Sequence, residues 1–383
     1  MPEHPSTAPG AGVAGDARRV GNAEAGAMTR EGGFKRRVRA RMARTGEAYG
    51  AARAQLDRVN GPRPLHVTNG DSVSRTLREA GVPGRVLTWA DVLHDGPVPE
   101  GSPTALRRVR ARHLAGRGWA DAAAAERRFA QRERVFRSHA GGRFVLWFEA
   151  DLYDQLLLLQ VLDALRRLGV DPGRATLVSV GEYRGIAHFA GLGELTAAQL
   201  APLAGEGTPL TADALELAAG AWAAFRAPDP AGLAAVTRAR SPELRFLGEA
   251  FGRLLQEYPS RIDGLSLTQR RILLAASSAA SAAGGDGAGV GRMFRDVSQQ
   301  ERRPFLGDGP FLAVLDELAG CQVPLLTRLG DAVTPTAAGA EVLAGRADHA
   351  RLNGVDRWIG GVHLTGRAPA WRYDERLESL VAG

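Results

Sequence analysis

The chain has 383 residues but only one cysteine, Cys321, so no disulfide can form within it. A single cysteine suits a reducing compartment. The longest apolar run, residues 156–165, is bounded by Asp154 and Arg166. It falls well short of the roughly 20 residues that a membrane-spanning helix requires. The first 30 residues also lack the apolar segment of a secretion signal. We therefore expect a cytoplasmic protein without a membrane partner.

Lysine is almost absent too, because Lys35 is the only lysine among 49 basic residues. The formal net charge of +7 is unevenly distributed: residues 1–64 hold 12 Lys and Arg against 6 Asp and Glu, and the rest hold 37 against 36. The folded body is thus close to neutral, which argues against a nucleic-acid groove in it. The basic helical stretch that begins at Phe34 reads first as a solvated helix. It is also the candidate contact for nucleic acid or another acidic partner.

Short apolar runs alternate with helical patterns between residues 65 and 205. The expected strands are residues 65–68, 85–89, 143–148 and 175–180, and the expected helices between them are residues 72–81, 104–138 and 152–169. Strands separated by helices indicate a parallel sheet with right-handed crossovers. We expect the strand order 2-1-3-4.

The later part of the chain has a different pattern. Residues 206–260 give only helical signals, whereas residues 261–366 give three helices, a strand, a tight turn, a strand and a helix. The expected fold is therefore α/β: a small parallel sheet with flanking helices over residues 63–205, followed by a helical connector and a winged-helix-like α+β module. Residues 1–62 are expected to be a disordered tail with short basic helices, and residues 367–383 a C-terminal tail.

The sequence LHVTNGDS, residues 65–72, changes abruptly from apolar to polar. Asn-Gly is a strong hairpin signal, but Val73, Leu77 and Ala80 follow at helical spacing and no partner strand comes before Gly84. The turn is therefore expected to lead into a helix, with Asp71 or Ser72 as its N-cap.

Each expected strand ends in polar residues, and the carboxyl ends of parallel strands meet at one edge of a sheet, where ligands bind. We therefore expect a polar and acidic crevice there. The candidate catalytic residues are Asp71, His94 and Glu149, and the candidate ligand-binding residues are Asn69, Gly70, Ser72, Asp95, Asp151 and Glu182.

Several of these residues also have purely structural interpretations. Asp151 and Asp154 have the spacing of a helix cap and a first-turn acid. His94 could be a satisfied turn histidine, and Asp95 could belong to a simple turn. Glu149 is harder to explain this way, because it directly follows an apolar strand.

Four kinds of chemistry remain open for the crevice. The carboxylates and His94 could bind a divalent metal, which is the candidate cofactor, although no compact ligand motif is present. Ser72 could act as a nucleophile with His94, but the G-x-S-x-G motif is missing. An anion could bind at the helix after Gly70, whereas a cationic ligand would suit the acids better.

Several motifs together resemble a bacterial domain-of-unknown-function family, the one numbered eighteen thirty-five. They are LHVTNGDS, TWADVLHDGPVP, LWFEADLYDQL and SVGEYRG with GLGELTAAQL, followed by ERRPFLGDGPF and NGVDRWIGGVHL. The resemblance covers residues 65–364 and implies no activity and no catalytic residues.

The expected function is that of a hydrolase or transferase acting on a small polar molecule. A ligand-sensing DNA-binding regulator and a protein-interaction module are the alternatives, and homo-oligomer formation is left open.

The third helix of the winged-helix-like segment, PFLAVLDELAG, has no basic residue and carries Asp316 and Glu317. DNA-reading helices need basic or amide side chains and phosphate contacts. We therefore predict that residues 264–364 bind duplex DNA without sequence preference or not at all. A gel-shift titration at moderate salt checks this, and discrimination between two DNA sequences would contradict it.

Overall fold

The computed structural model describes residues 35–50, 52, 63–187, 189–282 and 288–383. The chain divides into two compact units, Met1–Arg63 and Pro64–Gly383. In the first unit residues 35–45 are helical, and the helix ends before Gly46, which has a φ of +70°. The predicted disorder of residues 1–33 and most of the second short helix lie outside the described residues.

The second unit is built on a five-stranded sheet with the order β2-β1-β4-β5-β6. Strands β1 (Leu65–Thr68), β2 (Arg85–Thr88), β4 (Phe144–Glu149) and β5 (Ala175–Val180) are parallel, which confirms the predicted sheet and its order. The short strand β6 (Thr208–Pro209) was not predicted and pairs antiparallel with β5. All four residues of β1 are buried, as in a strand that is covered on both faces.

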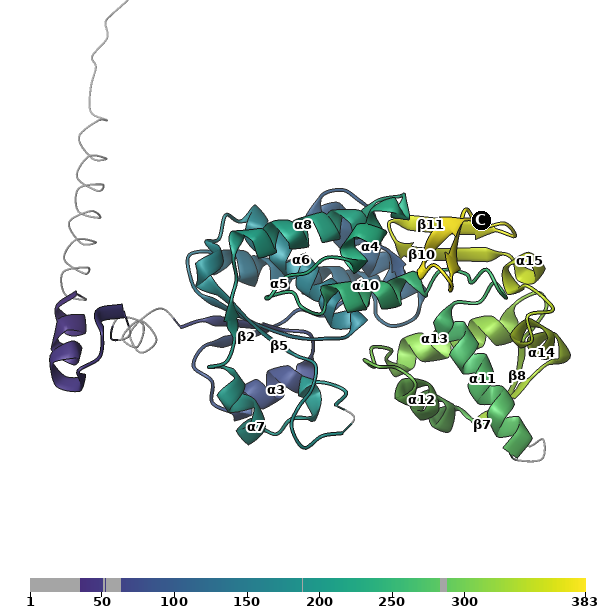
Figure 1. The fold of residues 1–383 in the computed structure, drawn as a ribbon, viewed down its shortest axis with the longest axis horizontal. Coiled ribbons are helices and arrows are strands. Elements are labelled where there is room, and N and C mark those ends of the chain that lie inside the picture. Colours follow the sequence, from purple (N-terminus) through teal and green to yellow (C-terminus); the bar gives the residue numbers. More distant parts are fainter. Residues whose placement is uncertain (1–34, 51, 53–62, 188, 283–287) are drawn as a thin grey trace, which may run out of the picture. The chain divides into compact units, whose positions relative to one another are not determined.

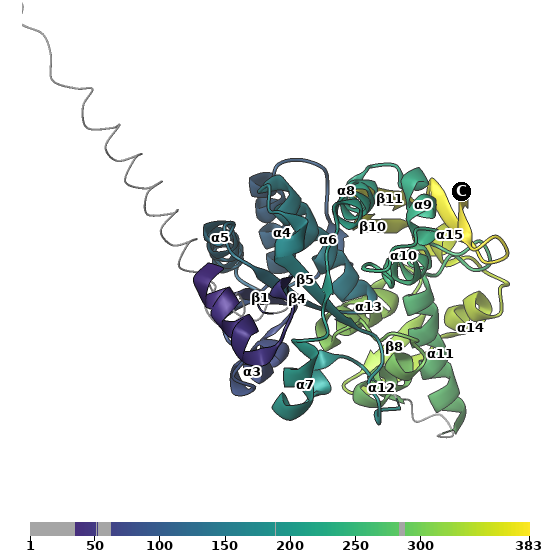
Figure 2. The ribbon, with the colours of Figure 1, turned by 60° about the vertical axis from the view of Figure 1, so that its left-hand side comes forward.

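Helices cover both faces of this sheet (Figures 1 and 2). One face carries α4 (Pro103–Gly116), α5 (Ala122–Ser138), α6 (Leu152–Arg167) and α8 (Ala212–Arg226), and the other carries α3 (Asp71–Glu79) and α7 (Ala197–Leu203). Successive side chains of β4 point to opposite faces. Leu146 and Phe148 therefore join the core under α6, whereas Trp147 packs with Val73 and Leu77 of α3.

Two helix predictions are wrong in detail. The N-cap of α3 is Gly70, because the carboxylate of Asp71 instead accepts a hydrogen bond from Thr88 at 3.2 Å. The single helix predicted over residues 104–138 is split into α4 and α5. The split follows from Gly118, which has a φ of +70°, and from Asp121, whose side chain caps α5 by accepting from the Ala124 N–H at 2.8 Å.

The segment predicted as a helical connector shares the core of the sheet. It comprises α8, α9 (Leu233–Thr237) and α10 (Leu247–Leu255), with the short 3-10 turn Pro230–Gly232 before α9. Its buried side chains, among them Trp222 and Phe251, belong to the same hydrophobic cluster as Leu157 of α6. These helices therefore thicken the helical layer and do not form a spacer.

A second hydrophobic core lies in residues 267–343. Helices α11 (Leu267–Ala282), α12 (Val290–Gln299) and α13 (Asp308–Gly320) pack with α14 (Ala337–Leu343) and with a three-stranded antiparallel sheet of order β7-β9-β8. Its strands are β7 (Ala288–Gly289), β8 (Leu326–Leu329) and β9 (Ala332–Pro335). No described helix of the chain is both long and apolar enough to cross a membrane.

The last part of the chain pairs with a segment that lies between β2 and α4. After α15 (His349–Asn353), β10 (Val355–Gly360) pairs antiparallel with β11 (Val362–Gly366) and parallel with β3 (Gly96–Pro97). The predicted tail is instead the strand pair β12 (Trp371–Asp374) and β13 (Ser379–Ala382). It is held because Arg372 pairs with Asp348 at 2.6 Å and the Tyr373 N–H donates to the Pro259 carbonyl at 2.9 Å.

We predict that deletion of residues 1–62 leaves the second unit folded, because the cores of that unit are made entirely of later residues. The melting temperature of the shortened chain should match that of the full chain within about 2 °C. Thermal unfolding by circular dichroism measures this, and limited proteolysis of the full chain should yield the same fragment. A stable fragment that begins before Phe34 would contradict the prediction.

Candidate functional site

The carboxyl ends of β1 and β4 lie side by side at one edge of the sheet. These strands are neighbours, but the helices that follow them, α3 and α6, lie on opposite faces (Figure 1). At such a point the two connections diverge and leave room for a ligand. Asn69 follows β1 and Glu149 ends β4, so both lie at this edge.

Three carboxylates meet there and form what we call the acid cluster: Glu149, Asp151 and Asp154. One carboxylate oxygen from each lies within 4.8 Å of the others. Their side chains are buried, with 8, 7 and 0 % of the residue surface exposed. Asp151 caps α6, since its carboxylate accepts from the Asp154 N–H at 3.1 Å. The cap predicted from the sequence spacing is therefore confirmed.

Asp154 ties the two strand ends together. One of its carboxylate oxygens accepts from the side-chain amide of Asn69 at 2.7 Å, and the other accepts from the backbone N–H of Glu149 at 2.5 Å. Both oxygens therefore serve the structure. From the sequence, Asp154 was expected only to be a first-turn acid of the helix.

Glu149 lies beneath the loop that follows β5. Its Oε1 atom accepts from the Leu192 N–H at 2.7 Å. Gly191 passes directly over the carboxylate with a φ of +150°, and a Cβ atom there would lie 2.0 Å from Glu149 Oε2. Only glycine allows the backbone to come this close.

The acid cluster retains protons near neutral pH. Burial, reinforced by the charge of Asp151, raises the pKa of Glu149 to about 8. Burial also raises the pKa of Asp151 to about 6 and that of Asp154 well above its ordinary value. Three adjacent carboxylates out of water cannot all stay charged. A carboxyl group that titrates near pH 8 can donate or accept a proton under physiological conditions.

The same group of oxygens could be considered for a divalent cation. Calcium takes six to eight oxygen ligands, and magnesium demands a near-octahedral shell. Both oxygens of Asp154 and one oxygen each of Glu149 and Asp151 already accept hydrogen bonds, so the acid cluster offers few free oxygen lone pairs to a cation. The geometry therefore favours a pair of carboxyl groups that holds protons.

Arg303 reaches this edge from the segment that follows α12. Its guanidinium donates to the Gly181 carbonyl and lies 3.5 Å from carboxylate oxygens of Glu182 and Glu249. Its positive charge also favours the ionised form of Asp151, although burial dominates the pKa of that residue.

Arg303 lines a cavity of about 920 Å³ between the loop after β5 and the segment 294–307. Aromatic and charged side chains share its walls, notably Glu182, Tyr183, Phe189, Phe294, Arg302 and Phe305. Ala190 is also part of the wall, and the next two residues cover Glu149. One loop thus borders both the cavity and the acid cluster.

Asp71 and Ser72 do not face the acid cluster. Both are exposed, and the Ser72 hydroxyl donates to the Gly193 carbonyl at 3.4 Å. His94 has no hydrogen-bond partner among the described residues. The hypothesis of a Ser72–His94 nucleophile is therefore wrong. Gly70 stays at the crevice as the N-cap of α3.

The other predicted residues have separate surroundings. His94 is buried against the rings of Tyr153 and Phe305, and burial lowers its pKa to about 4. Asp95 pairs with His113 at 2.6 Å and with Arg117 at 3.0 Å, and the side chain of Glu182 is 87 % exposed. The prediction that Asp71, His94, Glu149 and Glu182 surround one pocket is wrong, because Asp71 and Glu182 are exposed and His94 is buried against aromatic rings, which leaves only Glu149 of the four in the acid cluster.

Comparison with models of known protein families and with curated protein sequences gave no match for this chain. The resemblance to the family numbered eighteen thirty-five therefore stays a prediction. The candidate site is defined by the placement of the acid cluster and of the neighbouring cavity.

The raised pKa of Glu149 predicts how stability depends on pH. Between pH 7 and pH 8 the unfolded chain has this carboxyl ionised, whereas the folded chain still holds the proton. Unfolding then releases a proton, so the free energy of unfolding should fall by about 1 kcal/mol over this interval. Glu149→Gln should remove that fall.

Chemical denaturation at several pH values between 6.5 and 9 measures the effect. Glu79→Gln is the matched control, because it removes an exposed carboxylate at the end of α3. A decline that persists undiminished in Glu149→Gln would show that another group causes it.

Proposed function

We propose that the chain binds a small polar molecule at the carboxyl edge of its parallel sheet and that Glu149 exchanges a proton with it. This is the chemistry of a hydrolase or transferase that uses general acid–base catalysis. The observation that carries the proposal is the buried pair Glu149 and Asp151 at the point where the chain segments that follow β1 and β4 diverge.

The neighbouring cavity supports a small-molecule ligand. Its volume of about 920 Å³ is at the upper end of the roughly 300–1,000 Å³ that such sites occupy. The phenylalanine side chains in its wall offer an apolar surface, and Arg302 and Arg303 offer donors for a polar group. Arg303 lines this cavity, and its positive charge also favours the ionised form of Asp151.

We further infer that the three helices and the β7-β9-β8 sheet form a winged-helix-like module that walls the ligand cavity and does not read DNA. Phe294, Ser298 and Gln299 of α12 line the cavity. Arg328, the one basic residue of β8 and β9, forms an ion pair with Asp316 of α13. This pair reduces the positive charge that phosphate contacts would need.

A ligand screen tests the proposed function. Thermal unfolding is followed in the presence of nucleotides, sugar phosphates, amino acids, Mg²⁺ and Mn²⁺. We expect a small polar molecule to raise the melting temperature. Glu149→Gln should weaken the binding of that molecule at least tenfold, because the variant lacks the carboxyl proton that Glu149 exchanges. Glu79→Gln should bind normally.

Phe305→Ala opens the cavity wall and should therefore weaken the binding of the same ligand. A ligand that binds equally well to Glu149→Gln and Phe305→Ala would contradict the proposal. If Mg²⁺ or Mn²⁺ alone stabilises the chain, and if Glu149→Gln abolishes this stabilisation, then Glu149 and Asp151 bind a metal ion and do not act as a proton-holding pair.

A further inference from the structure

A second, smaller cavity lies within the helical layer, between α4, α5, α6 and α8. Its volume is about 160 Å³, and four aromatic residues contribute to its walls, namely Trp89, Phe129, Phe136 and Trp222. The charged residues that line it are six arginines and two acids: Arg107, Arg110, Arg132, Arg137, Arg167 and Arg226, with Asp91 and Glu133. Arg167 is paired at 2.7 Å with Asp163, which lies outside the lining, so the lining arginines without an ion pair among the described residues are Arg132, Arg137 and Arg226. None of these residues belongs to the acid cluster.

The two acids of the lining are already paired. Asp91 accepts from Arg110, with 2.9 Å between Asp91 Oδ1 and Arg110 Nη2, and both groups are almost fully buried. Glu133 pairs with Arg107 at 2.8 Å. Both acids also favour the charged form of Arg132 from a distance, but neither forms an ion pair with it.

Arg132 is a buried arginine that forms no ion pair with a described carboxylate. It is 5 % exposed, and no described carboxylate lies within ion-pair distance of its guanidinium. Nη1 donates to the Ala90 carbonyl at 2.6 Å and Nη2 to Gln160 at 3.4 Å, whereas Nε has no partner. Burial lowers the pKa of Arg132 only to about 10, so it stays charged at neutral pH.

The aromatic residues and Arg226 complete the surroundings. The guanidinium of Arg132 lies 4.5 Å from the ring centre of Trp89 and 4.3 Å from that of Phe129. Arg226, which is 9 % exposed, donates only to backbone carbonyls, those of Pro99 and Gly101. Two buried cations without a carboxylate are costly unless an anion joins them.

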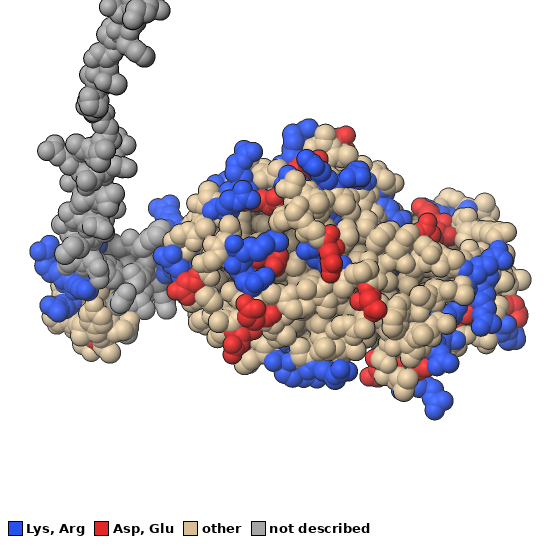
Figure 3. Space-filling model, turned by 90° about the horizontal axis from the view of Figure 1, so that it is seen from above, with Lys and Arg blue, Asp and Glu red and all other residues tan. Residues whose placement is uncertain are grey.

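We propose that this cavity binds a small oxyanion, either phosphate or a phosphate monoester. Guanidinium groups match phosphate oxygens in geometry and charge. Its volume of about 160 Å³ is well above the roughly 10–15 Å³ that a single water needs, so the cavity has room for a small oxyanion. The excess positive charge belongs to the cavity. On the outer surface seen in Figure 3, basic and acidic side chains are interspersed.

Isothermal titration of the full chain with inorganic phosphate and with phenyl phosphate tests the proposal, at constant ionic strength set with chloride. We expect saturable binding at one site for at least one of the two anions. Tighter binding of phenyl phosphate would identify a monoester with an aromatic group as the preferred ligand. Equal or weaker binding would identify the phosphate group alone.

Arg132→Gln and Arg226→Gln should each weaken this binding at least tenfold. Arg127→Gln removes an exposed arginine of the same helix α5 and should leave binding unchanged. Arg137→Gln, at an exposed position of the lining, should weaken binding even if a buried variant fails to fold. Glu149→Gln should bind the anion normally, which separates this site from the proposed function.

The absence of saturable binding by both anions would overturn the proposal. So would binding that persists unchanged in Arg226→Gln and Arg137→Gln, because the anion would then be held by other arginines of the chain.

Discussion

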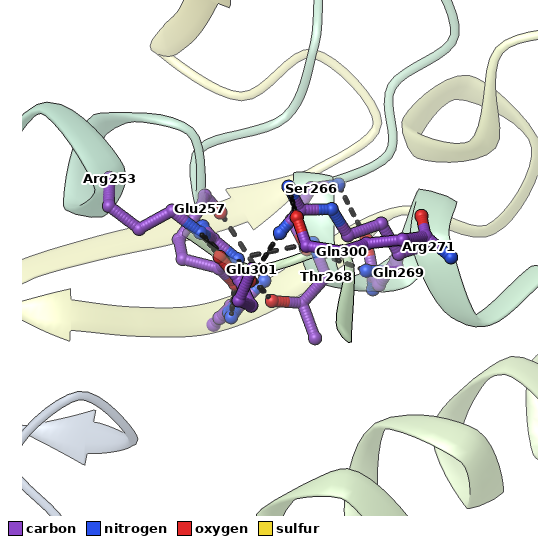
Figure 4. Close-up of polar contacts among 9 residues, drawn as sticks. Arg253, Glu257, Ser266, Thr268, Gln269, Arg271, Gln300 and Glu301 are labelled. Atoms are coloured by element: carbon purple, nitrogen blue, oxygen red, sulfur yellow. Dashed lines mark hydrogen bonds and ion pairs between the residues drawn. The ribbon is translucent and has the colours of Figure 1, made fainter. Parts of the chain in front are cut away.

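A buried network of ion pairs around Glu257 and Glu301 joins the two hydrophobic cores of the second unit (Figure 4). Arg253 of α10 lies 2.7 Å from a carboxylate oxygen of each glutamate, and Arg357 of β10 lies 2.6 Å from Glu257. Arg271 of α11 also pairs with Glu301. Burial opposes the charge of Glu257, but Arg253 and Arg357 outweigh it and lower its pKa to about 2. Removing one partner of such a buried pair typically costs about 3–5 kcal/mol.

The network also sets the geometry of the candidate site. It fixes Glu301, and the residues immediately after it approach the sheet: Arg303 donates to Gly181 at the end of β5, and Phe305 packs on His94. The large cavity lies between this segment and the loop after β5. One wall of the cavity is therefore held in place by these ion pairs. A ligand there would contact parts of the chain that are more than a hundred residues apart.

The sequence predicts the sheet better than the site, and the reason is physical. A strand such as Phe144–Glu149 has a local apolar pattern, and crossover rules then limit the strand order. Which way a polar side chain turns depends on partners elsewhere, as when His113 draws Asp95 away from the crevice. The role of Arg303 depends on a contact across 122 positions, and no local pattern marks it. The pairing of β3 with β10 was missed for the same reason.

Three buried charged groups among the described residues differ in how their charge is balanced. Around Glu257 and Glu301, each glutamate is paired with two arginines, so the carboxylates stay charged without an ion from solution. The acid cluster has like charges only, and its carboxyl groups escape the repulsion by taking up protons. Arg132 has no such escape, because a guanidinium keeps its proton throughout the physiological range. Its charge is offset by the more distant charges of Asp91 and Glu133, by the rings of Trp89 and Phe129 and, in our proposal, by a bound anion. Proton concentration would then act on the acid cluster, whereas anion concentration would act on the arginine-lined cavity.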